Sequence, residues 1–140
     1  MMAELQVQIV TPAGIVYDHR ASRVIVKSTD GQLGILPGHT PIIVPLIIDG
    51  VRIERVSVEQ EDLIAVNGGI MEMRDNICSI IADSAERARD IDVERAFAAK
   101  QRAEEKIRKA ESVHNSKQQR RAEVSLRKAI NRISVSKRNK

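Results

Sequence analysis

The chain has 140 residues, with 23 Lys and Arg against 19 Asp and Glu, and a formal net charge of +4. No apolar run approaches the roughly 20 residues that cross a membrane, and the N-terminus shows no signal or transit pattern. The single cysteine, Cys78, excludes an internal disulfide and a metal site built from several cysteines. This composition favours a cytosolic protein.

The charges divide the sequence into two modules. Residues 1–84 carry 6 basic and 11 acidic side chains, whereas residues 85–140 carry 17 basic and 8 acidic ones. All 7 glycines and all 4 prolines lie in the first module. We therefore expect a turn-rich acidic domain over 1–84 and an uninterrupted basic domain over 85–140.

The first module alternates apolar and polar side chains, which is the period-2 pattern of strands. Leu5, Val7 and Ile9 form one such face, and further short runs follow up to Ile81. Gly, Asn and Asp turn signals separate the runs, for example Asn67-Gly-Gly69. About eight runs at intervals of roughly 8–12 residues predict a small antiparallel β-sandwich or barrel.

The second module changes to apolar side chains at three- and four-residue spacing, which is typical of amphipathic helices. The pattern predicts helices over about 92–111 and 117–135, separated by a break at 112–116. Asp92 is placed to cap the first helix and Ser116 the second. The apolar seams are narrow and rich in alanine, so the hairpin buries little area and needs the sandwich or a partner.

Residues that could perform catalysis or bind a metal do not gather in this sequence. The histidines, His19, His39 and His114, fall in or beside separate loops. Cys78 lies in an apolar strand, which favours a buried thiol over a nucleophile. The glycine-rich stretch 30–39 lacks the Lys-Ser/Thr of a phosphate-binding loop and opens no helix. We therefore expect no catalytic residue and no metal site.

The basic helices raise the question of nucleic-acid binding, because 17 cations attract phosphates. Eight acidic residues interleave them, and the one aromatic residue, Phe97, lies on the apolar stripe, so bases have no stacking platform. A solvated helix face laced with ion pairs is the main interpretation. A basic arm drawn to an acidic protein surface, or a stand-alone adaptor that binds nucleic acid, stays open as the alternative.

Three motifs resemble the epsilon subunit of bacterial F-type ATP synthases. GQLGILPGHTPII at 31–43 is similar to the family's GELGILPGHAPLL, residues 67–96 to its second signature, and AEVSLRKAINRISV at 122–135 to its final helix. The motifs follow the family's order and span nearly the whole chain. The mitochondrial equivalent would carry a transit peptide, so we expect the bacterial form, peripheral at the cytoplasmic face of the cell membrane.

The resemblance implies an antiparallel β-sandwich of about ten short strands followed by a two-helix antiparallel hairpin. It implies a non-catalytic rotor subunit of a proton-translocating ATP synthase, which couples ring rotation to ATP synthesis. The implied partners are the gamma subunit, the ring of c subunits and the alpha and beta subunits, with membrane contact only through the complex. The ring-facing loop corresponds to Gln32–His39, where Gln32 replaces the family's acidic residue and His39 is retained.

The resemblance also implies that the hairpin regulates ATP hydrolysis. In related proteins it folds against the sandwich or extends toward the catalytic subunits, and the implied contact residues here are Arg120, Arg121, Arg127, Lys128 and Arg132. Residues 91–96 match the I/L-D-x-x-R-A motif with which some epsilon subunits bind ATP as a regulatory ligand. The implied ATP-binding residues are Ile91, Asp92, Arg95, Ala96, Arg102, Lys128 and Arg132. At position 128, nucleotide-binding relatives have Arg, which offers a planar fork of donors that Lys lacks.

Overall fold

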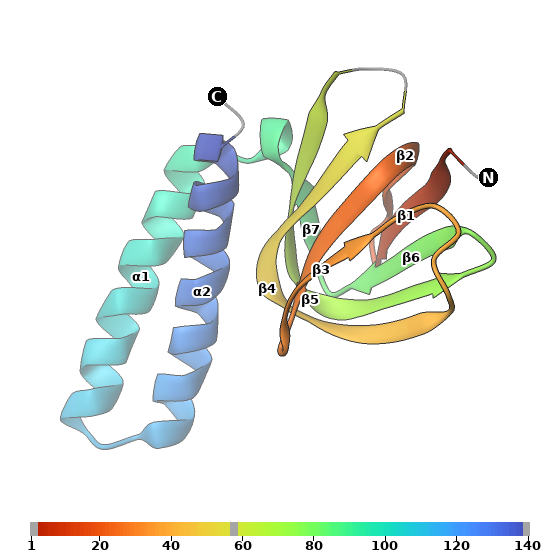
Figure 1. Ribbon diagram of the computed structural model, residues 1–140. Coiled ribbons are helices and arrows are strands. Elements are labelled where there is room, and N and C mark those ends of the chain that lie inside the picture. Colours follow the sequence, from red (N-terminus) through yellow and green to blue (C-terminus); the bar gives the residue numbers. More distant parts are fainter. Residues whose placement is uncertain (1–2, 57–58, 139–140) are drawn as a thin grey trace.

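The computed structural model describes residues 3–56 and 59–138, which form a β-sandwich and a two-helix hairpin (Figure 1). The hairpin follows a short 3-10 turn. The elements are β1 (Leu5–Thr11), β2 (Gly14–Ser28), β3 (Gly31–Ile35), β4 (Ile42–Arg55), β5 (Glu61–Arg74), β6 (Ile77–Ala82), β7 (Ala85–Arg87), η1 (Ala88–Asp90), α1 (Val93–Ser112) and α2 (Ser116–Arg138).

The strands form one sheet that closes on itself. Its order is β1-β6-β5-β4-β2-β3, and an additional pairing between β1 and β2 completes the closure, while β7 pairs with β5. The pairings are antiparallel except for β1 with β6, which is parallel. The expected β-sandwich followed by two helices is therefore confirmed, with one parallel pair that the sequence pattern did not indicate.

The number of strands differs from the expected ten, because the described residues form seven. Two of the long strands run through positions that the sequence pattern marks as turns. The Asp49-Gly50 pair lies inside β4, opposite Ala65 and Val66, and the 67–69 stretch lies inside β5. Gly68 and Gly69, with φ of +81° and +154°, bend β5 without ending it. The long strands consequently curve from one part of the sheet to another (Figure 1).

The core of the sandwich consists mainly of Val, Ile and Leu from the inward faces of the strands. Leu5, Val7 and Ile9 are fully buried, as their alternation predicts. Cys78 is also fully buried, and its burial raises the pKa of the thiol to about 12. This thiol therefore packs as a small apolar side chain.

The hairpin packs through a seam of small residues. The buried alanines of this seam are Ala96, Ala103, Ala110, Ala122 and Ala129. Asp92 caps α1, since the Arg95 N–H donates to Asp92 Oδ1 at 3.1 Å. The cap of α2 is Asn115 and not Ser116: the Gln118 N–H donates to Asn115 Oδ1 at 3.1 Å. The predicted helix begins at about residue 117, which makes Ser116 its cap. The observed α2 begins one residue earlier, at Ser116, so the capping position falls on Asn115.

The hairpin rests on the sandwich through α2, which lies against β4 and β5, while α1 lies on the far side of α2 (Figure 1). Near the C-terminal end of α2, Asn131 Nδ2 donates to the Val66 carbonyl at 3.3 Å. Val135 joins a small apolar cluster with Leu63, Ala65, Ala88 and Ile91. Within residues 3–56 and 59–138, neither helix is long and apolar enough to cross a membrane.

Candidate functional site

A hollow of about 430 Å³ lies between the start of α1 and the end of α2. Three carboxylates and three guanidiniums line it together with two alanines. These residues are Glu86, Asp90, Asp92, Arg95, Ala96, Ala99, Arg102 and Arg132. The structure thus brings together five of the seven residues that the resemblance implies for ATP.

Helix periodicity explains why these side chains converge. Arg95, Ala99 and Arg102 recur at four- and three-residue spacing, so they lie on one side of α1. Arg132 reaches the same hollow from α2, because the alanine seam lets the two helices approach closely. Three residues of the motif at 91–96, Asp92, Arg95 and Ala96, therefore start a face that a second helix completes.

Glu86 and Asp90 are residues of this hollow that the sequence did not reveal. Arg132 Nε donates to Glu86 Oε1 at 2.6 Å, across 46 residues of sequence. Glu86 belongs to β7 and Asp90 to η1, so the hollow includes the segment that links the sandwich to the hairpin. The pairing of β7 with β5 and the packing of Ala88 and Ile91 against Val135 place this segment beside α2, and no local pattern predicts either.

The other two implied residues lie elsewhere. Ile91 is 8% exposed and packs in the apolar cluster with Val135, so it supports the hairpin instead of lining the hollow. Lys128 lines an adjoining hollow of about 240 Å³. Lys106 and Ser125 line it as well, and Ala99, Arg102 and Arg132 belong to both hollows. The first hollow balances three acids and three bases, whereas the lining of the second is basic without an acid.

The basic residues predicted to contact the catalytic subunits differ in solvent exposure and in ion pairing. Arg120, Arg121 and Arg127 are exposed on α2. Lys128 is half-buried, and Arg132 is paired with Glu86. With the hairpin on the sandwich, the first three are therefore the ones that face solvent.

The loop between β3 and β4 carries the other predicted contact. Gln32 is exposed on β3, and the His39 Nδ1–H donates to the Thr40 carbonyl at 2.6 Å. The loop is held by Asn76: Asn76 Oδ1 accepts from the Gly38 N–H at 2.9 Å, and Asn76 Nδ2 donates to the Glu4 carbonyl at 2.7 Å. Asn76 can serve both partners because it turns between β5 and β6 with φ of +64°.

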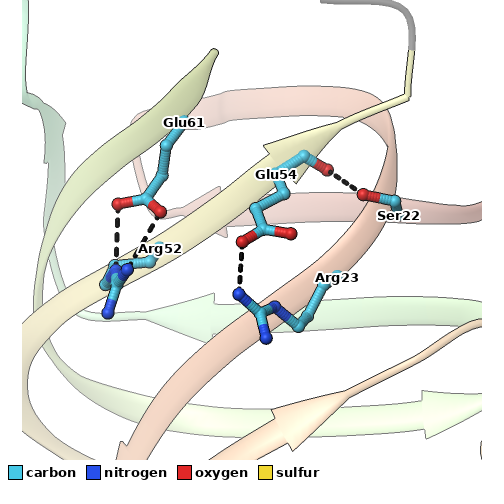
Figure 2. Close-up of polar contacts among 5 residues, drawn as sticks. All are labelled: Ser22, Arg23, Arg52, Glu54 and Glu61. Atoms are coloured by element: carbon cyan, nitrogen blue, oxygen red, sulfur yellow. Dashed lines mark hydrogen bonds and ion pairs between the residues drawn. The ribbon is translucent and has the colours of Figure 1, made fainter. Parts of the chain in front are cut away.

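A second group of charges lies on β2, β4 and β5, where ion pairs run between neighbouring strands (Figure 2). Arg52 Nε and Nη2 donate to the two carboxylate oxygens of Glu61 at 2.9 and 3.0 Å. These hydrogen bonds hold the pKa of Glu61 below its ordinary value. Arg23 pairs with the Glu54 carboxylate, and Ser22 Oγ donates to the Glu54 carbonyl at 3.3 Å. These charges neutralise one another, so we interpret the group as ion pairs that stabilise the packing of neighbouring strands.

Among residues 3–56 and 59–138, no group of three or more His, Cys, Asp or Glu side chains is arranged so that it could hold a metal ion. His19 packs edge-on against Tyr17, with ring centroids 4.7 Å apart. His39 lies in the β3–β4 loop and His114 in the turn between the helices, so the fold keeps the histidines apart.

Family models of known proteins match both the sandwich and the hairpin. The family model for the β-sandwich domain of the ATP synthase delta/epsilon chain matches residues 4–88. The model for the long α-helix domain of the same chain matches residues 89–137.

Solved structures show the same fold. One similar chain is in the cryo-EM structure of the Euglena gracilis mitochondrial ATP synthase, OSCP/F1/c-ring in rotational state 1; it is 17% identical, with a TM-score of 0.76, over 91% of this chain and 78% of that one. Another is in the central stalk/c-ring structure of the Tetrahymena thermophila mitochondrial ATP synthase, with 20% identity and a TM-score of 0.51 over 61% of this chain and 67% of that one. Since the two family models together match the sandwich and the hairpin described above, the chain belongs to the ATP synthase delta/epsilon chain family.

Proposed function

We propose that this chain is a non-catalytic central-stalk subunit of a bacterial proton-translocating F-type ATP synthase. In this role it couples rotation of the ring of c subunits to ATP synthesis, at the cytoplasmic face of the cell membrane. Family membership supports assembly into the complex. The observation that carries the proposal is an exposed apolar stripe on the sandwich, which a free-standing domain has no reason to keep.

The apolar stripe consists of Ile43 and Pro45 on β4, Ile70 on β5 and Ile81 on β6. Pro45 lies opposite Ile70, and Ile70 lies opposite Ile81, so these side chains share one face of the sheet. Ile43, Ile70 and Ile81 are 69%, 53% and 66% exposed. Contiguous apolar side chains on a sheet face indicate a protein interface, and we assign this one to the gamma subunit.

The β3–β4 loop is the contact that we assign to the ring of c subunits. Asn76 anchors its backbone, and Gln32, Leu36 and His39 present side chains around it. A loop held in place before binding loses less conformational entropy when it docks. Contact with the membrane then occurs only through the ring.

An Ile70→Asp variant tests the gamma contact. A carboxylate in the middle of the apolar stripe has to lose its water on docking, so we expect the variant to stop co-purifying with gamma, alpha and beta. Val113→Asp is the matched control, because Val113 is also an exposed apolar side chain but lies at the tip of the hairpin. Full assembly of Ile70→Asp would contradict this proposal. Failure of the unmodified chain to co-purify would favour the stand-alone adaptor.

The hairpin is proposed to inhibit ATP hydrolysis when it leaves the sandwich and extends toward the alpha and beta subunits. The exposed guanidiniums of Arg120, Arg121 and Arg127 support this role, since acidic surface attracts them over long range. Replacing all three with Ala should raise hydrolysis by the assembled complex. Lys109→Ala, which removes an exposed cation on α1, serves as the control, and equal rates for both variants would contradict the role.

ATP is the regulatory ligand that we propose for the two adjoining hollows. Asp92 uses Oδ1 to cap α1, and its second carboxylate oxygen is suited to accept from the adenine amino group. The basic hollow, with Arg102, Lys106, Lys128 and Arg132, suits the phosphates. Lys128 supplies a point charge where Arg would supply a fork of donors, so we place the terminal phosphate beside it.

Calorimetry of the full chain tests this ligand. We expect heat on addition of ATP, weaker binding in Arg95→Ala, and a loss in Lys128→Gln that is larger for ATP than for AMP. Lys109→Gln, outside both hollows, should bind like the unmodified chain. Absence of heat at millimolar ATP would refute the ligand, and an unaffected Arg95→Ala would refute this site.

A further inference from the structure

We infer that Gly50 on β4 sets the balance between the docked and the undocked hairpin, so that a single methyl group at this position releases α2 from the sandwich. The effect of a released hairpin on ATP hydrolysis by the complex rests on the proposed regulatory function. The docking contact itself is a property of this chain.

The contact between Gly50 and α2 is so close that a larger residue at position 50 would press against the helix. A Cβ atom on Gly50 would lie 3.0 Å from Val135 Cγ2 and 2.6 Å from Arg138 Nη2. The guanidinium of Arg138 ends a flexible side chain and can swing aside. Val135 is fully buried, and its β-branched side chain has one strongly preferred rotamer in a helix. An added methyl group therefore requires the end of α2 around Val135 to move away by a few tenths of an ångström.

The docking interface is short, so a displacement at one of its residues disturbs most of its contacts. The contacts described between α2 and the sandwich come from the segment between Asn131 and Arg138. They include the hydrogen bond from Asn131 to Val66 and the ion pair from Arg132 to Glu86. Hydrogen bonds weaken steeply when their geometry is disturbed. A shift of the helix end therefore loosens the polar contacts together with the apolar one.

The sandwich itself accepts alanine at position 50. Gly50 does not have a left-handed φ, unlike Gly68 and Gly69, so an L-residue fits its backbone. Replacing such a glycine lowers the entropy of the unfolded chain and tends to stabilise the fold. Gly34 on β3 is the matched control, because its backbone is equally permissive and a Cβ there meets nothing within 4 Å.

Docking is measured on the isolated full chain with spin labels on cysteines placed at Asp30 and His114, in the β2–β3 turn and the hairpin turn. Cys78 is fully buried and stays unlabelled. We expect Gly50→Ala to lower the docked-to-undocked ratio about tenfold, as overpacking of a tight contact does. Gly34→Ala should leave the ratio unchanged, and neither variant should lower the melting temperature of the sandwich.

A Val135→Ala background completes the experiment. Without Val135 Cγ2 the added methyl group has room, so Gly50→Ala should change the docking ratio far less there. Wild-type distances in Gly50→Ala, or the same effect in both backgrounds, would overturn the inference. Hydrolysis by complexes that carry Gly50→Ala is measured separately. A released hairpin supports the inference at any hydrolysis rate, and an unchanged rate would then contradict the regulatory function alone.

Discussion

The hydrogen bond between Tyr17 and Asp62 allows a direct test of how much a buried polar network stabilises the sandwich. Tyr17 Oη donates to Asp62 Oδ2 at 2.5 Å, and Arg55 Nε donates to the same oxygen at 2.6 Å. Tyr17 and Asp62 are both buried. The Arg87 guanidinium lies 5.4 Å from the centre of the Tyr17 ring, so the network ties β2, β4 and β5 to the strand that leads into the hairpin.

The expected cost of breaking this network follows from its burial. Tyr17→Phe keeps the ring and removes one donor from a buried carboxylate, which costs about 2 kcal/mol in the free energy of unfolding. Asp62→Asn also leaves Arg55 without its ion partner and costs about 3 kcal/mol, at the lower end for buried pairs because Arg55 is 25% exposed. For a chain of this size, the loss in Tyr17→Phe corresponds to roughly 8 °C in melting temperature.

The effect of Asp62 should depend on pH. Burial raises the pKa of Asp62, but the hydrogen bonds from Tyr17 and Arg55 outweigh it and hold the pKa below its ordinary value. A depressed pKa means that the folded state binds the proton less readily than the unfolded state. The stabilisation is therefore complete above the ordinary pKa of about 4 and is lost as the pH falls through the folded value.

Urea unfolding from neutral pH down to about pH 3 measures this dependence. Asp18→Asn is the matched control, because Asp18 is an exposed carboxylate next to Tyr17 on β2. We expect Asp62→Asn to be far less stable than the control at neutral pH, with a gap that narrows in acid. Equal stability of the two variants at neutral pH, or a gap that does not narrow, would refute the reasoning.

Three smaller tests address the hairpin, the β3–β4 loop and the thiol. Asp92→Ala removes the cap of α1 and should lower the stability of this helix by about 1 kcal/mol, measured as faster hydrogen exchange in its first turn. Unchanged exchange would show that the cap does not stabilise the helix. Asn76→Gly keeps the turn but removes the bond to Gly38 in the β3–β4 loop and the bond to Glu4 before β1, so the Gly38 amide should exchange faster while the strands keep their protection. Cys78 should not react with a thiol reagent at mildly alkaline pH until the chain is unfolded, because burial raises the pKa of its thiol to about 12; rapid reaction of the folded chain would contradict its placement.

Local chemistry in the sequence determined most of the elements and the family. The alternation at Leu5, Val7 and Ile9 predicts a buried strand face, and Asp92 predicts the start of a helix, because both signals depend on residues close in sequence. The motif at 31–43 and the final helix carried the family resemblance, which the family models confirm. The motif at 91–96 also pointed to one side of the hollow, since helical spacing alone places Asp92, Arg95 and Ala96 together.

Only the tertiary structure decided which distant segments meet. Asp49-Gly50 has the composition of a turn, yet pairing with β5 makes it a continuous part of β4 and places Gly50 beneath Val135. Glu86 meets Arg132 because β7 pairs with β5 and α2 docks on the same strand. Such contacts depend on the register of the sheet and on the angle at which a helix arrives. Neither leaves a periodic trace in the sequence, because the free energy of these contacts comes from surfaces that the chain brings together only on folding.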